Sequence, residues 1–360
     1  MSSDWHHDYN ALVGFIRDHP EIEIGIHKTR IPDSIRGEFY YLFDKTLSGY
    51  VDSLNAELVV MSAFLGERYQ EVLHNLANSA NIKVISSPST TRFTINPFHE
   101  VVNSIFEVLW DLLKEKITVD AFSTSATKKI DQTIGPLFIE AYQQWILLVL
   151  LVLLDCADIQ QVILGDLSRY EVHKYQLSIG DVPAPASLTN IMFNHESAVK
   201  FIVPNVIAYS VKLEKYCAFR LGANRPLLKA SDLSPTREWV SLPKTGKVVR
   251  DNQAFVYLGN TPENIKLVAD TQYMCKPDAI LEFLVGNEAG LSEIITRIKN
   301  QHDSLGPPAG TFVVFANKIP DTLQLNNKGI HILEVGFDQS KLQPVVTNLV
   351  GCQSSYIRIR

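Results

Sequence analysis

Apolar residues recur at helical spacing through the first 160 residues of the chain. In the segment 101–116, for example, Ile105, Val108, Leu109 and Leu112 fall on one side of a helix. A short β-rich run at 81–86 interrupts the helical pattern, and it is ended by a Ser-Pro pair. The pattern predicts helices over 34–54, 65–77, 101–116 and 134–155.

The pattern changes after about residue 160, where short β-rich runs alternate with Pro and Gly. The last hundred residues then alternate between strand and helix periodicity, with apolar runs typical of buried strands. This alternation predicts an α/β sheet that is covered on both faces. The expected strands are 278–285, 311–316 and 329–335, and the expected helices are 290–304 and 342–349.

Together these patterns predict a chain of two parts, which agrees with its length of 360 residues. Residues 1–165 are expected to form a mainly helical domain for recognition or oligomerisation. Residues 185–360 are expected to form an α/β domain, a mixed β-sheet flanked by helices, so that the whole is α+β. The Pro-rich stretch 179–187 is the expected linker.

One apolar run, Trp145 to Leu154, has the composition of a membrane span. Its ten residues are fewer than the roughly 20 needed to cross a bilayer, so we expect a helix through the middle of the fold and no membrane partner. The N-terminus lacks the basic-then-apolar order of a signal peptide. The four cysteines are too few and too scattered for a disulfide framework or a zinc cluster, which favours a reducing cytoplasm.

The composition of 46% hydrophobic and 20% charged residues supports a large core and excludes disordered, collagen-like and coiled-coil classes. Lys and Arg total 33 against 39 Asp and Glu, a net charge of −6, so any binding of phosphate has to be local.

The best local candidate for phosphate binding is a cation-rich segment between residues 219 and 250, which also contains Trp239. It is equally typical of a solvated loop with ordinary surface charge. The residues expected to contact nucleic acid are Arg220, Arg225, Arg237, Lys247 and Arg250.

Two acids share one face of the expected strand after Pro277, because Asp278 and Glu282 are separated by an even number of residues. Acids on a buried strand are costly unless they are paired, hydrated or bound to a cation. We expect them to lie about 7 Å apart along the strand and to share Mg²⁺, or Mn²⁺, directly or through water. Lys276 or Lys318 would hold the attacking water or the phosphate. The alternative is a strand-entry turn, with Glu282 facing solvent at a sheet edge.

The run Lys276-Pro-Asp-Ala-Ile-Leu-Glu-Phe283, followed by an amphipathic helix and by Gly310-Thr-Phe-Val-Val-Phe-Ala-Asn-Lys318, resembles the core of the PD-(D/E)xK nucleases. The resemblance covers roughly residues 254–336. It implies a restriction-endonuclease-like fold in which the Asp after Pro, here Asp278, binds a divalent metal. In that family a second acid, with a Lys two residues beyond it, completes the site on the neighbouring strand.

The sequence departs from this family pattern because no Asp/Glu-x-Lys follows at the usual hairpin distance. Glu282 supplies an acid without the lysine, and Lys318 supplies a lysine without the acid. Either Glu282 is the second acid, with Lys318 or Lys276 in place of the usual lysine, or the site is inactive.

Three functions follow from these residues. The first is a metal-dependent DNA endonuclease, or the nuclease subunit of a restriction or phage-defence system, acting with a partner subunit or as a homodimer; RNA is a further possible substrate. The second is a catalytically inactive nuclease-like subunit that binds nucleic acid or protein. The third, a small-molecule α/β enzyme or a nucleotide sensor, lacks a Gly-rich phosphate loop after any strand.

Overall fold

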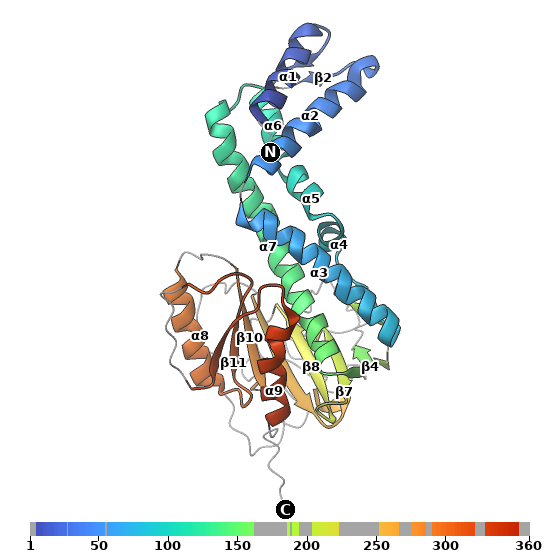
Figure 1. Cartoon of the computed structure of the whole chain (residues 1–360), viewed down its shortest axis with the longest axis vertical. Helices are drawn as coiled ribbons and strands as arrows, with labels where there is room; N and C mark the ends of the chain where they lie inside the picture. Colours follow the sequence, from blue (N-terminus) through green and yellow to red (C-terminus); the bar gives the residue numbers. More distant parts are fainter. Residues whose placement is uncertain are drawn as a thin grey trace, which may run out of the picture. The chain divides into compact units, whose positions relative to one another are not determined.

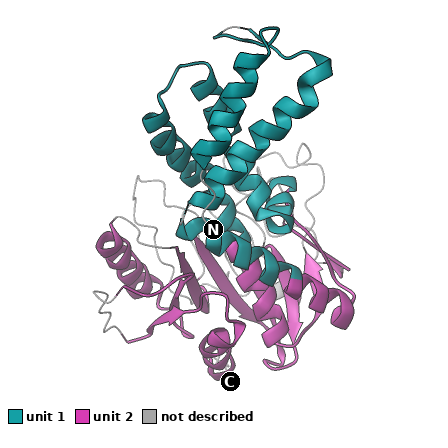
Figure 2. Ribbon diagram, turned by 45° about the horizontal axis from the view of Figure 1, so that its top comes forward, with its two compact units in different colours: residues 1–70, 88–141 teal, residues 71–87, 142–360 magenta. Residues whose placement is uncertain are grey.

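The structure is a computed structural model of the whole chain, and Figure 1 shows its helices and strands. It describes residues 5–26, 28–54, 56–161, 186–187, 189–193, 204–222, 252–265, 276–285, 290–320 and 328–352. The chain divides into two compact units, coloured separately in Figure 2. Unit 1 comprises Met1–Gln70 and Pro88–Ala141, and unit 2 comprises Glu71–Ser87 and Tyr142–Arg360. This division differs from the expected boundary at 165–185, which falls largely outside the described residues.

Unit 1 is helical, as the sequence pattern predicts. Its one described β-hairpin pairs β1 (Glu23–Ile24) with β2 (Thr29–Arg30). Its helices are α1 (Trp5–Asp18), α2 (Asp33–Ser53), the first part of α3 (Glu57–Ala80), α4 (Pro88–Ile95), α5 (Pro97–Ser104), α6 (Phe106–Leu113) and the first part of α7 (Val119–Leu153).

The single helix expected over 101–116 is instead two helices, α5 and α6, which meet at Ile105. The backbone of Ile105 leaves helical geometry at φ −105° and ψ 6°, while its side chain is fully buried. The apolar spacing continues across the break, and this is why periodicity alone does not detect it.

Aromatic side chains from α2 and α6 form much of the core of unit 1. Phe39 stacks on Trp110 with ring centroids 5.6 Å apart, and Phe43 lies 5.0 Å from Trp110 and 4.9 Å from Phe106. These offset and tilted pairs add to the burial of apolar area, so α6 is held firmly against α2.

Unit 2 contains an eight-stranded mixed sheet of strand order β12-β11-β10-β9-β8-β7-β4-β5. The strands β10, β11 and β12 run parallel, and all the other neighbours in this sheet are antiparallel. A separate parallel pair joins β3 (Lys83–Ile85) to β6 (Asn190–Met192). The bounds of the sheet strands are β4 (Cys156–Gln161), β5 (Ala186–Ser187), β7 (Val206–Ser210), β8 (Lys215–Leu221), β9 (Gln253–Gly259), β10 (Ala279–Leu284), β11 (Thr311–Phe315) and β12 (Ile330–Glu334).

Helices cover both faces of this sheet, as expected for strands with continuous apolar runs. On one face α8 (Leu291–Leu305) packs Ile298 against Leu284 and Val313. On the other face the end of α7 contributes Tyr142, whose ring lies 6.4 Å from that of Phe283 and whose hydroxyl donates to the carbonyl of Gly336 at 3.0 Å. The short 3-10 helices Pro262–Ile265 and Gln339–Leu342 and the helix α9 (Gln343–Gly351) complete the described elements.

The expected helix over 134–155 is the second part of α7, which has 35 residues and begins at Val119. By length and composition α7 is able to cross a membrane, yet 67% of its most apolar 18-residue window is buried inside the protein. Every residue from Trp145 to Leu151 is buried. This burial agrees with the prediction of a core helix.

Two helical glycines provide a matched test of packing in unit 1. A Cβ added at Gly66 in α3 would lie 2.8 Å from Cγ of Pro97 and 3.1 Å from the carbonyl oxygen of Thr94, whereas one added at Gly37 in α2 meets nothing within 4 Å. We expect Gly66→Ala to lower the free energy of unfolding by about 1–3 kcal/mol, because a ring and a backbone atom must move. We expect Gly37→Ala to raise it by about 0.5–1 kcal/mol through helix propensity.

Urea unfolding of the two variants beside the wild-type protein measures both changes. An equal gain in stability from the two substitutions would contradict the close packing of α3 against the link between α4 and α5.

Candidate functional site

Asp278 lies immediately before β10 and is almost completely buried, with 1% of its surface exposed. Its backbone N–H donates to the carbonyl of Val256 at 2.8 Å, and its carboxylate accepts a hydrogen bond from the backbone N–H of Leu258 at 2.7 Å. Pro277 has no N–H to donate, which suits its position two residues before β10, ahead of the ladder of hydrogen bonds. The Asp278 carboxylate therefore extends the hydrogen bonding of β9 beyond the point where β10 begins.

Glu282 lies in β10 and is fully buried. Its Oε1 accepts a hydrogen bond from the Arg297 guanidinium of α8 in an ion pair, and 33% of the Arg297 side chain is exposed. The residues opposite Glu282 on the neighbouring strands are Gln253 of β9 and Val313 of β11, so neither neighbour places a second carboxylate beside it. The expectation that Glu282 faces solvent at a sheet edge, the alternative to metal binding, is wrong.

A second polar contact joins the same helix to the sheet. The side-chain amides of Gln253 and Gln301 exchange two hydrogen bonds, of 2.7 and 3.1 Å. Arg297 and Gln301 are four residues apart and hence share one face of α8, opposite the cross-strand pair Glu282 and Gln253. We call these four residues the helix–sheet polar cluster. Its helical half was missed by sequence analysis, although the i, i+4 spacing of Arg297 and Gln301 is visible in the sequence.

The separation of the two acids differs from the expected 7 Å. Asp278 and Glu282 are four residues apart, and at the strand rise their Cα atoms lie roughly 13 Å apart. Ligands of Mg²⁺ lie only about 2.0–2.1 Å from the ion, so the two carboxylates do not fit a single ion. In the part of the chain that the structure describes, no group of three or more His, Cys, Asp or Glu residues is arranged to hold a metal.

The two candidate lysines lie at different ends of the sheet. Lys276 is half-buried just before β10, and Lys318 is exposed shortly after β11. Because β10 and β11 run parallel, a residue before one strand and a residue after the other lie at opposite ends of the strands. Only Lys276 lies at the same end as Asp278, so the structure does not bring the expected acids and lysines together.

Arg220, the described member of the expected nucleic-acid patch, is a buried residue of β8 with 4% exposure. It pairs in register with Phe255 of β9, so it does not contribute to an exposed cationic surface. The other members, Arg225, Arg237, Lys247 and Arg250, lie outside the described residues.

Two histidines meet where β11 and β12 begin. The His302 ring forms a 2.9 Å hydrogen bond with the hydroxyl of Thr311, and the His331 ring stacks on Phe312 with centroids 5.0 Å apart. The backbone approaches both rings so closely that a Cβ at Gly310 would lie 3.2 Å from His331. Burial, together with the electrostatic effect of the neighbouring His302, lowers the pKa of His331 below its usual range.

Comparison of the chain with protein-family models, curated proteins and solved structures finds no match.

The helix–sheet polar cluster predicts an asymmetric response to mutation. Arg297→Gln leaves the Glu282 carboxylate buried without its cation, and we expect it to lower the free energy of unfolding by about 3 kcal/mol. Glu282→Gln leaves a partly exposed guanidinium and is expected to cost less, about 1–2 kcal/mol. The double variant should be more stable than Arg297→Gln alone, because the buried Glu282 carboxylate is removed together with its cation.

Denaturant unfolding of the three variants completes a double-mutant cycle. Glu293→Gln, an exposed position on the same helix, is the matched control and should change stability by less than about 0.5 kcal/mol. Additive effects of the two single substitutions would show that Glu282 and Arg297 are not coupled.

The histidines predict a dependence of stability on pH. Because the folded-state pKa of His331 is lowered, its contribution to stability is present above the unfolded pKa of about 6.5 and is lost as the pH falls through the folded pKa. We expect His331→Gln to flatten this part of the stability profile, measured as thermal midpoint against pH. His99→Gln, at an exposed position of α5, should leave the profile unchanged.

Proposed function

We propose that the protein is a catalytically inactive, nuclease-like subunit that binds nucleic acid without cutting it. The observation that supports this proposal is that both acids expected at the metal site are buried and used in structural contacts. Asp278 accepts the backbone N–H of Leu258, and Glu282 accepts the guanidinium of Arg297.

These contacts give each acid a role in the fold. Asp278 satisfies a backbone donor that would otherwise be buried without an acceptor at the end of the β9–β10 ladder. Glu282 fixes the position of α8 on the sheet through a charge-assisted hydrogen bond. Binding both acids to metal would require two separate metal sites, because their Cα atoms lie roughly 13 Å apart.

The segments β10, α8 and β11 carry the resemblance to the PD-(D/E)xK nucleases, which act on nucleic acid. Nucleic acid is therefore the proposed partner. A sheet of this kind that has lost its acid-x-lysine pair keeps its scaffold without the groups that position water at a metal. The cation-rich segment near residues 219–250 gives the sequence a local source of positive charge.

A metal-dependent endonuclease is the second candidate. The observation that favours it is the presence of two buried acidic side chains, Asp278 and Glu282, at the sheet, since buried titratable residues also mark active sites. Mg²⁺ or Mn²⁺ would be its cofactor.

Metal and stability measurements separate the two candidates. We expect Asp278→Ala to lower the free energy of unfolding by about 1–3 kcal/mol, because the N–H of Leu258 loses its buried acceptor. We also expect the thermal midpoint of the wild-type protein to be insensitive to Mg²⁺ or Mn²⁺, and plasmid DNA to stay intact with either ion. Asp303→Ala, an exposed acid on α8, is the control for loss of one negative charge.

If the two acids form a metal site, the stability of Asp278→Ala and the effect of metal on the thermal midpoint change in the opposite way. Removing one of its carboxylates would raise stability in the absence of metal and abolish a metal-dependent rise in the midpoint. Metal-dependent cutting that Asp278→Ala abolishes would establish the nuclease and refute the inactive subunit.

A further inference from the structure

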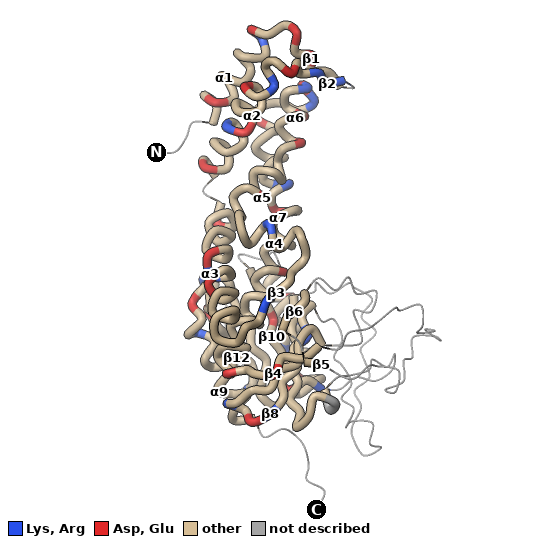
Figure 3. The backbone as a smooth tube through the Cα atoms, turned by 90° about the vertical axis from the view of Figure 1, so that its right-hand side faces the viewer, with Lys and Arg blue, Asp and Glu red and all other residues tan. Residues whose placement is uncertain are grey.

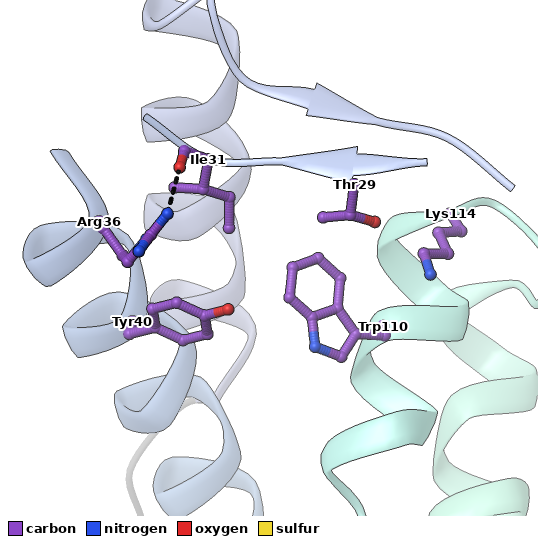
Figure 4. Close-up of a pocket in the computed structure, with 6 residues that line it drawn as sticks. All are labelled: Thr29, Ile31, Arg36, Tyr40, Trp110 and Lys114. Atoms are coloured by element: carbon purple, nitrogen blue, oxygen red, sulfur yellow. Dashed lines mark hydrogen bonds between the residues drawn. The ribbon is translucent and has the colours of Figure 1, made fainter. Parts of the chain in front are cut away.

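Unit 1 contains a cavity of about 470 Å³ between α2, β2 and α6. Its volume lies within the range of small-molecule sites. Figure 4 shows the aromatic side chains of Tyr40 and Trp110 projecting into it from the two helices, with Arg36 and Lys114 on opposite sides. The lining residues are Thr29, Ile31, Arg36, Tyr40, Trp110 and Lys114.

The fold uses only some of the polar groups that line this cavity: the Arg36 guanidinium donates to the carbonyl of Ile31 at 3.3 Å (Figure 4). Within the described part of the chain, the Tyr40 hydroxyl, the Trp110 indole nitrogen and the Thr29 hydroxyl form no hydrogen bond. Each of these groups can bond to a ligand without breaking a contact inside the protein.

Lys114 differs from the other cations near the cavity. Arg36 is paired with Asp33 at 2.7 Å, and Lys116 is paired with Asp111 at 2.9 Å. Figure 3 shows acidic and basic positions interspersed along this unit. Lys114 forms no ion pair with any described residue, and its ammonium lies over the ring of Trp110, 5.6 Å from the centroid. A half-buried cation on an aromatic surface attracts an anion that can also contact the ring.

We propose that this cavity binds a nucleotide unit of a single-stranded nucleic acid, with the base against Tyr40 and Trp110 and a phosphate at Lys114. The exposed guanidinium of Arg36, on the opposite side of the rings, contacts a phosphate on the other side of the base (Figure 4). Aromatic side chains bracketed by cations are how proteins hold single strands, because every base has a π-face and every linkage carries a charge. The assignment rests on the proposed binding of nucleic acid and extends it to a site in the helical unit.

The residues that line the cavity fit a single-stranded nucleic acid better than an acidic peptide. An acidic peptide uses the cations but has no need for two aromatic surfaces with free polar tips. A base meets both requirements, because its edge bonds to the hydroxyl and indole groups while its face stacks. A paired duplex does not fit this arrangement, since its bases are stacked on each other.

Fluorescence anisotropy tests the assignment with the full chain and a labelled single-stranded DNA of about ten nucleotides, which is within the usual site size. We expect Lys114→Gln to weaken binding about tenfold and to reduce the slope of log K against log salt by about 0.7, the loss of one phosphate contact. Lys116→Gln removes the same charge two residues away, outside the cavity, and should change affinity by less than about twofold.

A second pair of variants tests the aromatic surface. Tyr40→Leu should weaken binding by about fivefold or more, the lower end of measured base–aromatic stacking, whereas Tyr41→Leu should have no effect because Tyr41 is 67% exposed and does not line the cavity. Urea unfolding of all four variants checks that the fold is intact.

Several outcomes would overturn the assignment. Equal losses of affinity from Lys114→Gln and Lys116→Gln, or from Tyr40→Leu and Tyr41→Leu, would show that binding does not depend on the residues that line the cavity. The proposed function would still stand. A duplex, AMP or an acidic tyrosine-containing peptide that binds as tightly as the single strand would assign the site to another ligand. Binding of no nucleic acid would overturn both this site and the proposed function, and metal-dependent cutting would overturn only the inactivity of the sheet.

Discussion

The contact between Glu282 and Arg297 fixes the helix α8 on the sheet of unit 2. A carboxylate in the middle of a buried strand is tolerated only when a cation or several donors compensate it. Here the cation comes from the helix that directly follows the strand, and the neighbouring Gln253 and Gln301 repeat the same connection with amides. Because the partner is a protein side chain and not an ion, the buried charge explains the position of α8 and does not by itself require catalysis.

Sequence periodicity predicted most of the fold, because buried residues recur along the sequence at the period of the helix or strand that contains them. The strands after residue 278, the helix α8 and the covering of both sheet faces are confirmed. Periodicity failed where the apolar spacing continues across a change in backbone geometry. The break at Ile105 is one case, and the N-terminal extension of α7 to Val119, beyond its most apolar segment, is another.

The candidate site was harder to predict because spacing along a strand does not say what lies across it. The even spacing of Asp278 and Glu282 indicated that they share one face of the strand. The expected distance of about 7 Å is the length of a single two-residue repeat, however, and the two acids are two such repeats apart. The identity of the partners depends on register and on the packing of α8, which bring Gln253 and Arg297 to Glu282. No local motif around the acids encodes these contacts. The expected lysines illustrate the same limit, since parallel strands separate Lys276 from Lys318.

The buried acids of the sheet are bonded to protein groups, whereas Lys114 in the cavity of unit 1 has no ion-pair partner among the described residues. This difference supports a ligand site in unit 1. The buried acids of the sheet contact protein donors, so a ligand would have to compete with contacts that stabilise the fold. In the cavity between α2 and α6, Lys114 and the polar tips of Tyr40 and Trp110 are supported by aromatic packing and keep their bonding capacity. Phe39 and Phe43 hold Trp110 in place before a ligand arrives, so little conformational freedom is lost when it binds. A preorganised ring beside an uncompensated cation is therefore the better basis for recognition, and the paired acids of the sheet are the better basis for stability.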